Sequence, residues 1–168
     1  MRTLTLALVL FTSLSGCGPS PEWRSGSPVQ VEVAPDLPIS MDVARQAVID
    51  RLGQFGIPAG GGGRSIRVSF DPACGAGAPG AVVVAHTTDR IWVCSAITET
   101  LKKTLRGPYL VVSHEMGHML GLVGHLPAGQ GNLMSPIFDD YKGASGFGGA
   151  DIRAICAAGH VDSPACGR

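Results

Sequence analysis

The sequence predicts an α+β fold in which a mixed, twisted β-sheet packs against a few helices. Short runs with strand character dominate the first part of the chain, and helical patterns dominate the rest. That order is typical of α+β or mixed-sheet domains. A length of 168 residues with 45% hydrophobic residues suits one packed domain. The predicted strands are residues 29–33, 65–70, 81–87 and 90–95, and the main predicted helices are residues 40–53, 108–121 and 150–159.

The first segment in chain order has the pattern of a secretory signal peptide. Arg2 supplies a positive start, and Leu4 to Leu14 form an uncharged, mostly apolar run. That run is shorter than the roughly 20 residues needed to cross a bilayer, so a cleaved leader is favoured. A buried core helix is the alternative, but such a helix seldom opens a chain and stops at "SGCGPSP".

The end of this segment resembles the lipobox of bacterial lipoproteins. Leu14-Ser15-Gly16-Cys17 carries the resemblance, which implies cleavage before Cys17 and a lipid on that cysteine. The predicted organisation is a signal peptide over 1–16, a lipidated N-terminus and flexible tether over 17–28, and one domain over 29–168. The resemblance implies an exported protein, lipid-anchored at the bacterial cell envelope or released outside the cell. Gly18 favours the outer membrane if the cell is Gram-negative.

The next elements follow from side-chain periodicity and from breakers. Residues 29–33, "VQVEV", alternate apolar and polar side chains and predict a strand. Ser40 is a good helix cap, and apolar residues at helical spacing predict a helix to about Gly53 or Gly56. Pro58 and the following glycine run end it. The later strands are joined by a turn at Thr88-Asp89, and a short helix is expected within residues 97–107.

The second half contains a buried helix, a long loop and a closing helix. Pro108 suits the first turn of the buried helix, which is apolar on nearly all sides and ends near Gly121. Residues 126–148 form a Gly- and Pro-rich loop. The closing helix has Asp151 near its N-terminus, where a negative charge meets the helix dipole favourably.

Export favours disulfides among the remaining cysteines. Four cysteines allow three connectivities, and the two local pairs, Cys74–Cys94 and Cys156–Cys166, each bracket one compact segment. A zinc–cysteine site is the rival interpretation, but the chain has no C-x-x-C pair.

The stretch "SHEMGHMLGLVGH" carries the chemistry. His114 and His118 are four residues apart, which places both imidazoles on one face of a helix within reach of one ion. Glu115 is offset from that face, so it is placed to touch a water on the metal. A catalytic zinc keeps a position open for water and lowers its pKa to about 7. A neighbouring carboxylate can take the water's proton and pass it to a leaving amine.

This stretch, followed by "GNLMSP", resembles the metzincin clan of zinc endopeptidases, and most closely its matrixin-type members. Their pattern is H-E-x-x-H-x-x-G-x-x-H followed by a turn holding a methionine. His114, Glu115, His118 and Gly121 match that pattern, and Met134 matches the turn, which implies an apolar floor beneath the zinc. The resemblance covers about residues 28–158. It implies that residues 81–87 lie near the edge strand where an extended substrate pairs.

One position departs from that pattern. Gly124 stands where the family has its third histidine, and His125 comes one residue later. Because the helix has already ended at Gly121, a small bulge can absorb the added residue. A catalytic zinc needs three protein ligands, so His125 is the predicted third ligand. The alternative is an exposed His125 with a carboxylate, Asp139 or Asp140, completing the set.

The remaining histidines and tyrosines and two of the methionines have separate expected roles. Tyr141 could reach the site from the loop and hydrogen-bond an oxyanion. His86 and Tyr109 are expected to be structural, His160 is expected to lie in solvent, and Met116 and Met119 are expected to fill the core.

The sequence therefore predicts a monomeric zinc endopeptidase with one catalytic Zn²⁺, acting on protein or peptide substrates. A balanced charge, with a formal net of +0, gives no basic excess to attract nucleic acid. The lipid is the expected membrane attachment. The displaced His125 motivates a second hypothesis, an inactive zinc-binding module that binds a peptide or protein partner. A third, in which the histidines are merely core, conflicts with the cost of burying unpaired polar groups.

Overall fold

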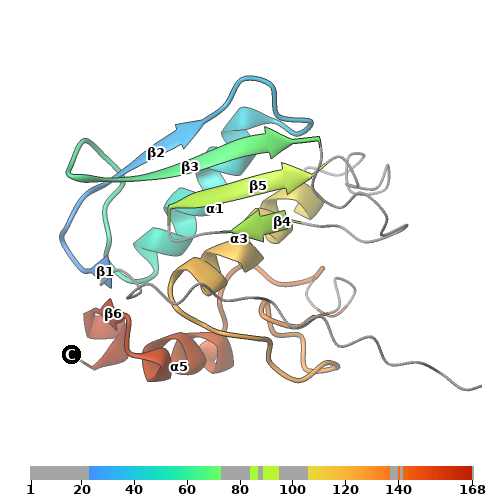
Figure 1. Ribbon diagram of the computed structural model, residues 1–168. Coiled ribbons are helices and arrows are strands. Elements are labelled where there is room, and N and C mark those ends of the chain that lie inside the picture. Colours follow the sequence, from blue (N-terminus) through green and yellow to red (C-terminus); the bar gives the residue numbers. More distant parts are fainter. Residues whose placement is uncertain are drawn as a thin grey trace, which may run out of the picture.

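The α+β architecture predicted from the sequence is confirmed in the computed structural model, which describes residues 23–72, 84–86, 89–94, 106–136, 140 and 142–167. Within these residues, three helices of ten or more residues accompany a four-stranded sheet (Figure 1). The helices are α1 (Met41–Gly53), α3 (Arg106–Met119) and α5 (Gly149–Ala158). The sheet strands are β2 (Val29–Val33), β3 (Arg64–Asp71), β4 (Val84–His86) and β5 (Arg90–Cys94).

The sheet is mixed, with strand order β2-β3-β5-β4. The first three of these strands run parallel, and β4 runs antiparallel to β5 at the edge. Helix α1 connects the parallel neighbours β2 and β3, as such a pairing requires. The β3 residues Ile66 and Val68 and the β5 residues Ile91 and Val93 are fully buried. These strands therefore form the sheet side of the core.

Helix α1 begins and ends where the sequence predicts. The Ser40 side chain accepts a hydrogen bond from the Val43 N–H at 3.5 Å, which caps the first turn. The buried residues of α1 include Ala44, Val48 and Leu52, and this helix packs along α3. Gly56, at φ +68°, completes the turn that carries the chain away.

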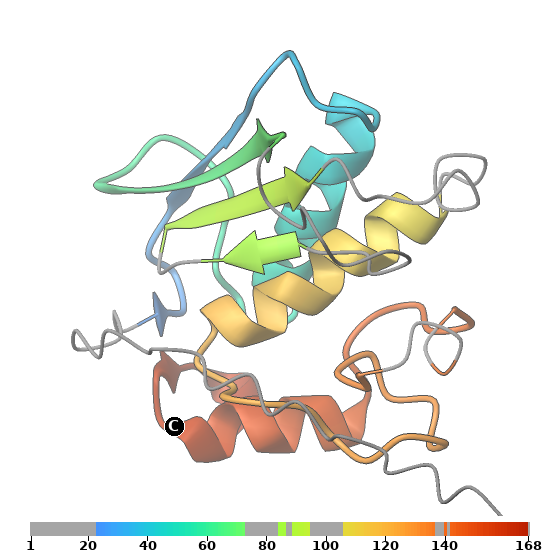
Figure 2. The same ribbon diagram turned by 45° about the vertical axis from the view of Figure 1, so that its right-hand side comes forward.

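Helix α3 is buried along almost its whole length. Pro108 lies in its first turn, as predicted, and Met116 and Met119 lie in the core. Figure 2 shows α3 between the sheet and α5, which explains its lack of a polar face. A helix enclosed in this way offers a rigid platform for side chains that leave it on one side.

The predicted flexible tether over residues 17–28 is wrong at Trp23 and Arg24. These two residues form β1 (Trp23–Arg24), which pairs in parallel with β6 (Val161–Asp162) close to the C-terminus. Trp23 is only 1% exposed. The Gly-, Ser- and Pro-rich composition favours a flexible chain, and ordering that chain costs conformational entropy. Burial of the large indole offsets this cost. The folded structure therefore includes Trp23, six residues before the predicted start of the domain.

Cysteine pairing agrees with the prediction where it is described. Cys156 of α5 forms a disulfide with Cys166 of the short 3-10 helix η1 (Pro164–Cys166). Cys94 is also disulfide-bonded, and its predicted partner Cys74 lies outside the described residues. The predicted leader and Cys17 lie outside them as well, as do residues 97–105 of the short helix predicted within residues 97–107, whose last two residues belong to α3. None of the described helices is long and apolar enough to cross a membrane.

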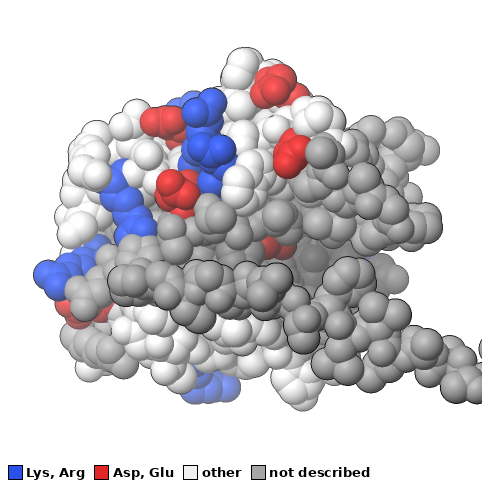
Figure 3. All heavy atoms as spheres, in the orientation of Figure 1, with Lys and Arg blue, Asp and Glu red and all other residues white. Residues whose placement is uncertain are grey.

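The described charges on one face of the molecule are mixed in sign. In Figure 3 most of the visible basic side chains lie on the upper and left parts of the face, with acidic side chains among them, and one basic patch lies at the lower edge. This distribution is consistent with the balanced composition, which has 13 basic and 13 acidic residues.

Candidate metal centre

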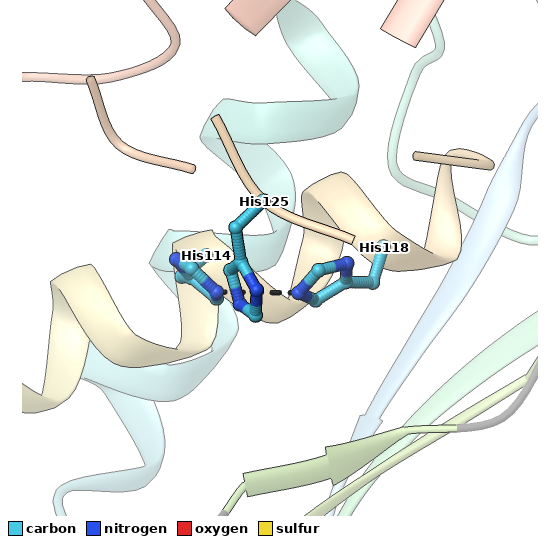
Figure 4. Close-up of side chains that lie close together, drawn as sticks. All are labelled: His114, His118 and His125. Atoms are coloured by element: carbon cyan, nitrogen blue, oxygen red, sulfur yellow. Dashed lines mark hydrogen bonds between the residues drawn. The ribbon is translucent and has the colours of Figure 1, made fainter. Parts of the chain in front are cut away.

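Three histidines converge at one point beside α3. His114 and His118 project from the helix and His125 from the loop that follows it (Figure 4). One ring nitrogen from each residue lies within 4.8 Å of the others. The ring centroids are 5.0, 5.1 and 5.0 Å apart, an almost equilateral triangle. The three side chains predicted as ligands are thus brought together, and they could hold a metal ion.

Backbone carbonyls fix the orientation of the two helical imidazoles. The Nδ1 of His114 lies 2.7 Å from the Leu133 carbonyl oxygen, and the Nδ1 of His118 lies 2.8 Å from that of Leu122. A carbonyl oxygen only accepts hydrogen bonds, so each Nδ1 carries the proton and donates it. In the neutral rings, both Nε2 atoms are then free of hydrogen and available to a metal.

The two Nε2 atoms face each other at 3.2 Å (Figure 4). Two bare lone pairs at this distance repel each other unless a cation or a shared proton lies between them. The fixed tautomers and the short separation are therefore compatible with a metal ion in the triangle or with a proton shared by the two nitrogens.

The loop that follows α3 is shaped by two glycines. At the end of α3 the Leu122 N–H bonds to the Gly117 carbonyl and the Gly121 N–H to the His118 carbonyl, which is a Schellman motif. Gly121 has φ +107° and Gly124 has φ +87°, both in the left-handed region that side chains disfavour. These two glycines turn the chain back so that His125 reaches the triangle.

Asp140, the alternative ligand, is occupied elsewhere. Its Oδ2 accepts hydrogen bonds from the Ser135 hydroxyl at 2.6 Å and from the Gly129 N–H at 2.7 Å. These bonds to the charged form lower the pKa of its carboxyl group. Asp140 thus braces the loop, and the described cluster consists of histidines. Asp139 and Tyr141, also considered from the sequence, lie outside the described residues.

Glu115 is nearly enclosed, with 8% of its surface exposed. Burial raises the pKa of its carboxyl group to about 8, because the charged form loses hydration. A divalent cation beside it would favour the carboxylate and lower that pKa. Partial burial of the ring lowers the pKa of His125, which favours the neutral form that binds metal.

Met134 packs directly against α3 at Gly117. It is fully buried, and a Cβ at Gly117 would overlap the sulfur and the methyl group of Met134. Only a glycine at 117 therefore allows this approach. Met134 therefore contacts the part of α3 that lies between His114 and His118 in sequence.

Replacing Gly117 by alanine is expected to destabilise the protein by about 1–3 kcal/mol through overpacking against Met134. Ordinarily, glycine to alanine in a helix is stabilising. Gly53→Ala in α1 is the matched control, since a Cβ there meets nothing within 4 Å. Urea unfolding should give opposite signs for the two variants. Equal stabilisation of both would contradict the close packing.

Asp151 anchors the turn that contains Met134, a role that sequence reasoning missed. It is fully buried, and its carboxylate accepts hydrogen bonds from three backbone N–H groups, those of Leu133, Met134 and Gly148. The sequence indicated only a favourable acidic residue in the first turn of α5. The carboxylate of Asp151 also binds the segment that contains Leu133 and Met134. Side-chain periodicity cannot predict such a contact between distant segments.

Asp151→Ala should lower the free energy of unfolding by about 3–5 kcal/mol, because three buried N–H groups lose a charged acceptor. Asp42→Ala is the control, since Asp42 also lies in the first turn of its helix but is exposed. Urea unfolding of the metal-free proteins measures the difference. A loss for Asp151→Ala no larger than for Asp42→Ala would rule out the anchoring role.

His160 does not lie free in solvent as predicted. It is partly buried, and its ring packs against Gly121 at the end of α3. Sequence reasoning also missed Trp23, which contacts the same end of this helix. No protein-family model matches the chain, and no curated protein matches it significantly.

Proposed function

We propose that this chain is a zinc-dependent endopeptidase of metzincin type, closest to the matrixins. The observation that carries the proposal is the triangle of His114, His118 and His125 with Glu115 beside it on the same helix. The turn containing Met134 beneath that helix supports it. The mixed sheet with an antiparallel edge strand next to α3 is compatible with it.

The donor set fits zinc better than a hard cation. Among the described residues the cluster consists of three imidazoles without a carboxylate, which favours zinc over calcium or magnesium, since these prefer oxygen ligands. Two nitrogens bound tetrahedrally at about 2.0–2.1 Å lie roughly 3.3–3.4 Å apart. The 3.2 Å between the Nε2 atoms of His114 and His118 is close to that value. Three protein ligands leave one position for substrate or water, the arrangement of catalytic zinc sites.

In this proposal His114, His118 and His125 would hold zinc, which would supply Lewis-acid polarisation of the scissile carbonyl and of the attacking water. Glu115 accepts the proton of that water at its carboxylate and delivers it to the amine nitrogen that leaves. Its enclosure strengthens its electrostatic interactions and limits proton loss to solvent. The carbonyls of Leu133 and Leu122 hold the two imidazoles in the tautomer that the metal requires.

An extended peptide is the proposed substrate. β4 is the last strand of the described sheet and contacts α3, so its outer edge would offer backbone groups near the histidines. A monomer anchored through a lipid on Cys17 at the cell envelope would act on proteins exposed there. This localisation rests on the resemblance of residues 14–17 to a lipobox.

Metal analysis and a peptide-library assay test the proposal together. The purified protein is expected to contain one zinc per chain and to cleave peptides or casein. A chelator should abolish cleavage, and added Zn²⁺ should restore it. Stoichiometric zinc without cleavage of any library member would instead support the inactive, partner-binding module. Absence of bound zinc would refute both functions.

A further inference from the structure

We propose that Trp23 and His160 form a clasp that positions the third-ligand loop of the metal site. The clasp consists of these two residues, and the third-ligand loop is the segment from Leu122 to His125. The inference rests on the proposed zinc site, and it assigns to the N- and C-terminal segments a role in how tightly the metal is held.

The first half of the clasp is the indole of Trp23. Its Nε1–H donates a 2.8 Å hydrogen bond to the carbonyl of Met119, the last residue of α3. The last carbonyls of a helix have no partner within the helix and need an external donor. Trp23 is separated from Met119 by 96 residues in the chain and is almost fully buried. The N-terminal strand therefore caps the C-terminal end of the helix that carries His114 and His118.

The second half is the ring of His160. A Cβ at Gly121 would lie 2.8 Å from both Cβ and Cγ of His160, so the ring covers the turn that ends α3. The carbonyl of His160 accepts a 2.8 Å hydrogen bond from the N–H of Trp23, which joins the two halves.

The segment carrying His160 is itself fixed at both sides. The Cys156–Cys166 disulfide closes the loop that contains it. The buried hydroxyl of Ser163 donates a 2.8 Å hydrogen bond to the carbonyl of Phe55, which joins this loop to the segment after α1. These contacts hold the ring of His160 in place against Gly121, in the turn that ends α3.

That turn leads directly into the metal site. Leu122, the residue after Gly121, provides the carbonyl that orients His118, and three residues later His125 completes the triangle. Movement of the turn would shift one ligand and the orienting group of another at once. Loss of groups that orient metal ligands typically costs about 10–100-fold in metal affinity. The clasp residues are thus positioning residues that do not touch the metal.

Two variants test the clasp. Trp23→Phe keeps most of the apolar bulk and removes the indole N–H that bonds to Met119. His160→Ala removes the imidazole ring and keeps the backbone hydrogen bond to Trp23. Zinc affinity is measured by competition with a chromophoric chelator, and the visible spectrum of the Co²⁺ form reports ligand geometry. Each variant is expected to lose about 10–100-fold in zinc affinity and to show an altered Co²⁺ spectrum.

Ser40→Ala is the control, since it removes the hydrogen bond that caps the N-terminus of α1, a contact that takes no part in the clasp. It should lower stability in urea but leave zinc affinity and the Co²⁺ spectrum unchanged. Wild-type affinity and an unchanged spectrum in His160→Ala would overturn the clasp, even if Trp23→Phe failed to fold. A wild-type chain that binds no zinc would overturn the proposed function itself, together with the clasp that rests on it.

Discussion

Replacing Glu115 by glutamine is expected to reduce peptide hydrolysis by about 10²–10⁴-fold while zinc remains bound. Glutamine has nearly the shape of glutamate, so the buried position is still filled. It cannot accept a proton from water, and no step could return that proton to the leaving amine. Because Glu115 is outside the histidine triangle, the metal ligands are unchanged.

The measurement is kcat/KM on a fluorogenic peptide, with zinc content determined on the same preparation. Glu32→Gln is the matched control, since it makes the same chemical change in β2, away from the histidines. The control should retain wild-type activity. Undiminished hydrolysis by Glu115→Gln would exclude Glu115 as the proton carrier, and loss of zinc in that variant would instead indicate a ligand role.

The features that the sequence predicted well are those set by neighbouring residues. Ser40 caps α1, Pro108 lies in the first turn of α3, and Gly121 ends α3 in the left-handed conformation. Spacing by four on a helix was enough to bring His114 and His118 together, since helix geometry alone dictates that contact. The α+β class followed from the order of such local patterns.

The features that were missed depend on contacts between distant segments. Trp23 was assigned to a tether because its neighbours are Gly, Ser and Pro, yet its indole reaches a carbonyl 96 residues away. Asp151 was recognised only as an acid near a helix start, although its carboxylate holds the turn of Met134. His160 was assigned to solvent because nothing near it in sequence indicates that it packs against Gly121. Contacts between residues so far apart in the chain leave no periodic pattern in the sequence, so the sequence does not predict them.

His125→Ala is expected to weaken zinc binding by about 100–1,000-fold. Structural zinc sites with four ligands bind with about 10–16 kcal/mol, which corresponds to roughly 2.5–4 kcal/mol for each ligand. His125 is exposed, so the substitution should leave the urea unfolding of the metal-free protein almost unchanged. Loss of affinity without loss of stability would separate a ligand from a structural histidine.

Asp140→Asn distinguishes the two candidates for the third ligand. Its carboxylate bonds to Ser135 and Gly129, so its replacement should perturb the loop while zinc remains bound. Competition with a chelator on both variants gives the comparison. If Asp140→Asn lost zinc and His125→Ala kept it, the third ligand would be the carboxylate of Asp140 and not His125. The opposite result would identify His125 as the third ligand, which the two left-handed glycines, Gly121 and Gly124, bring to the triangle.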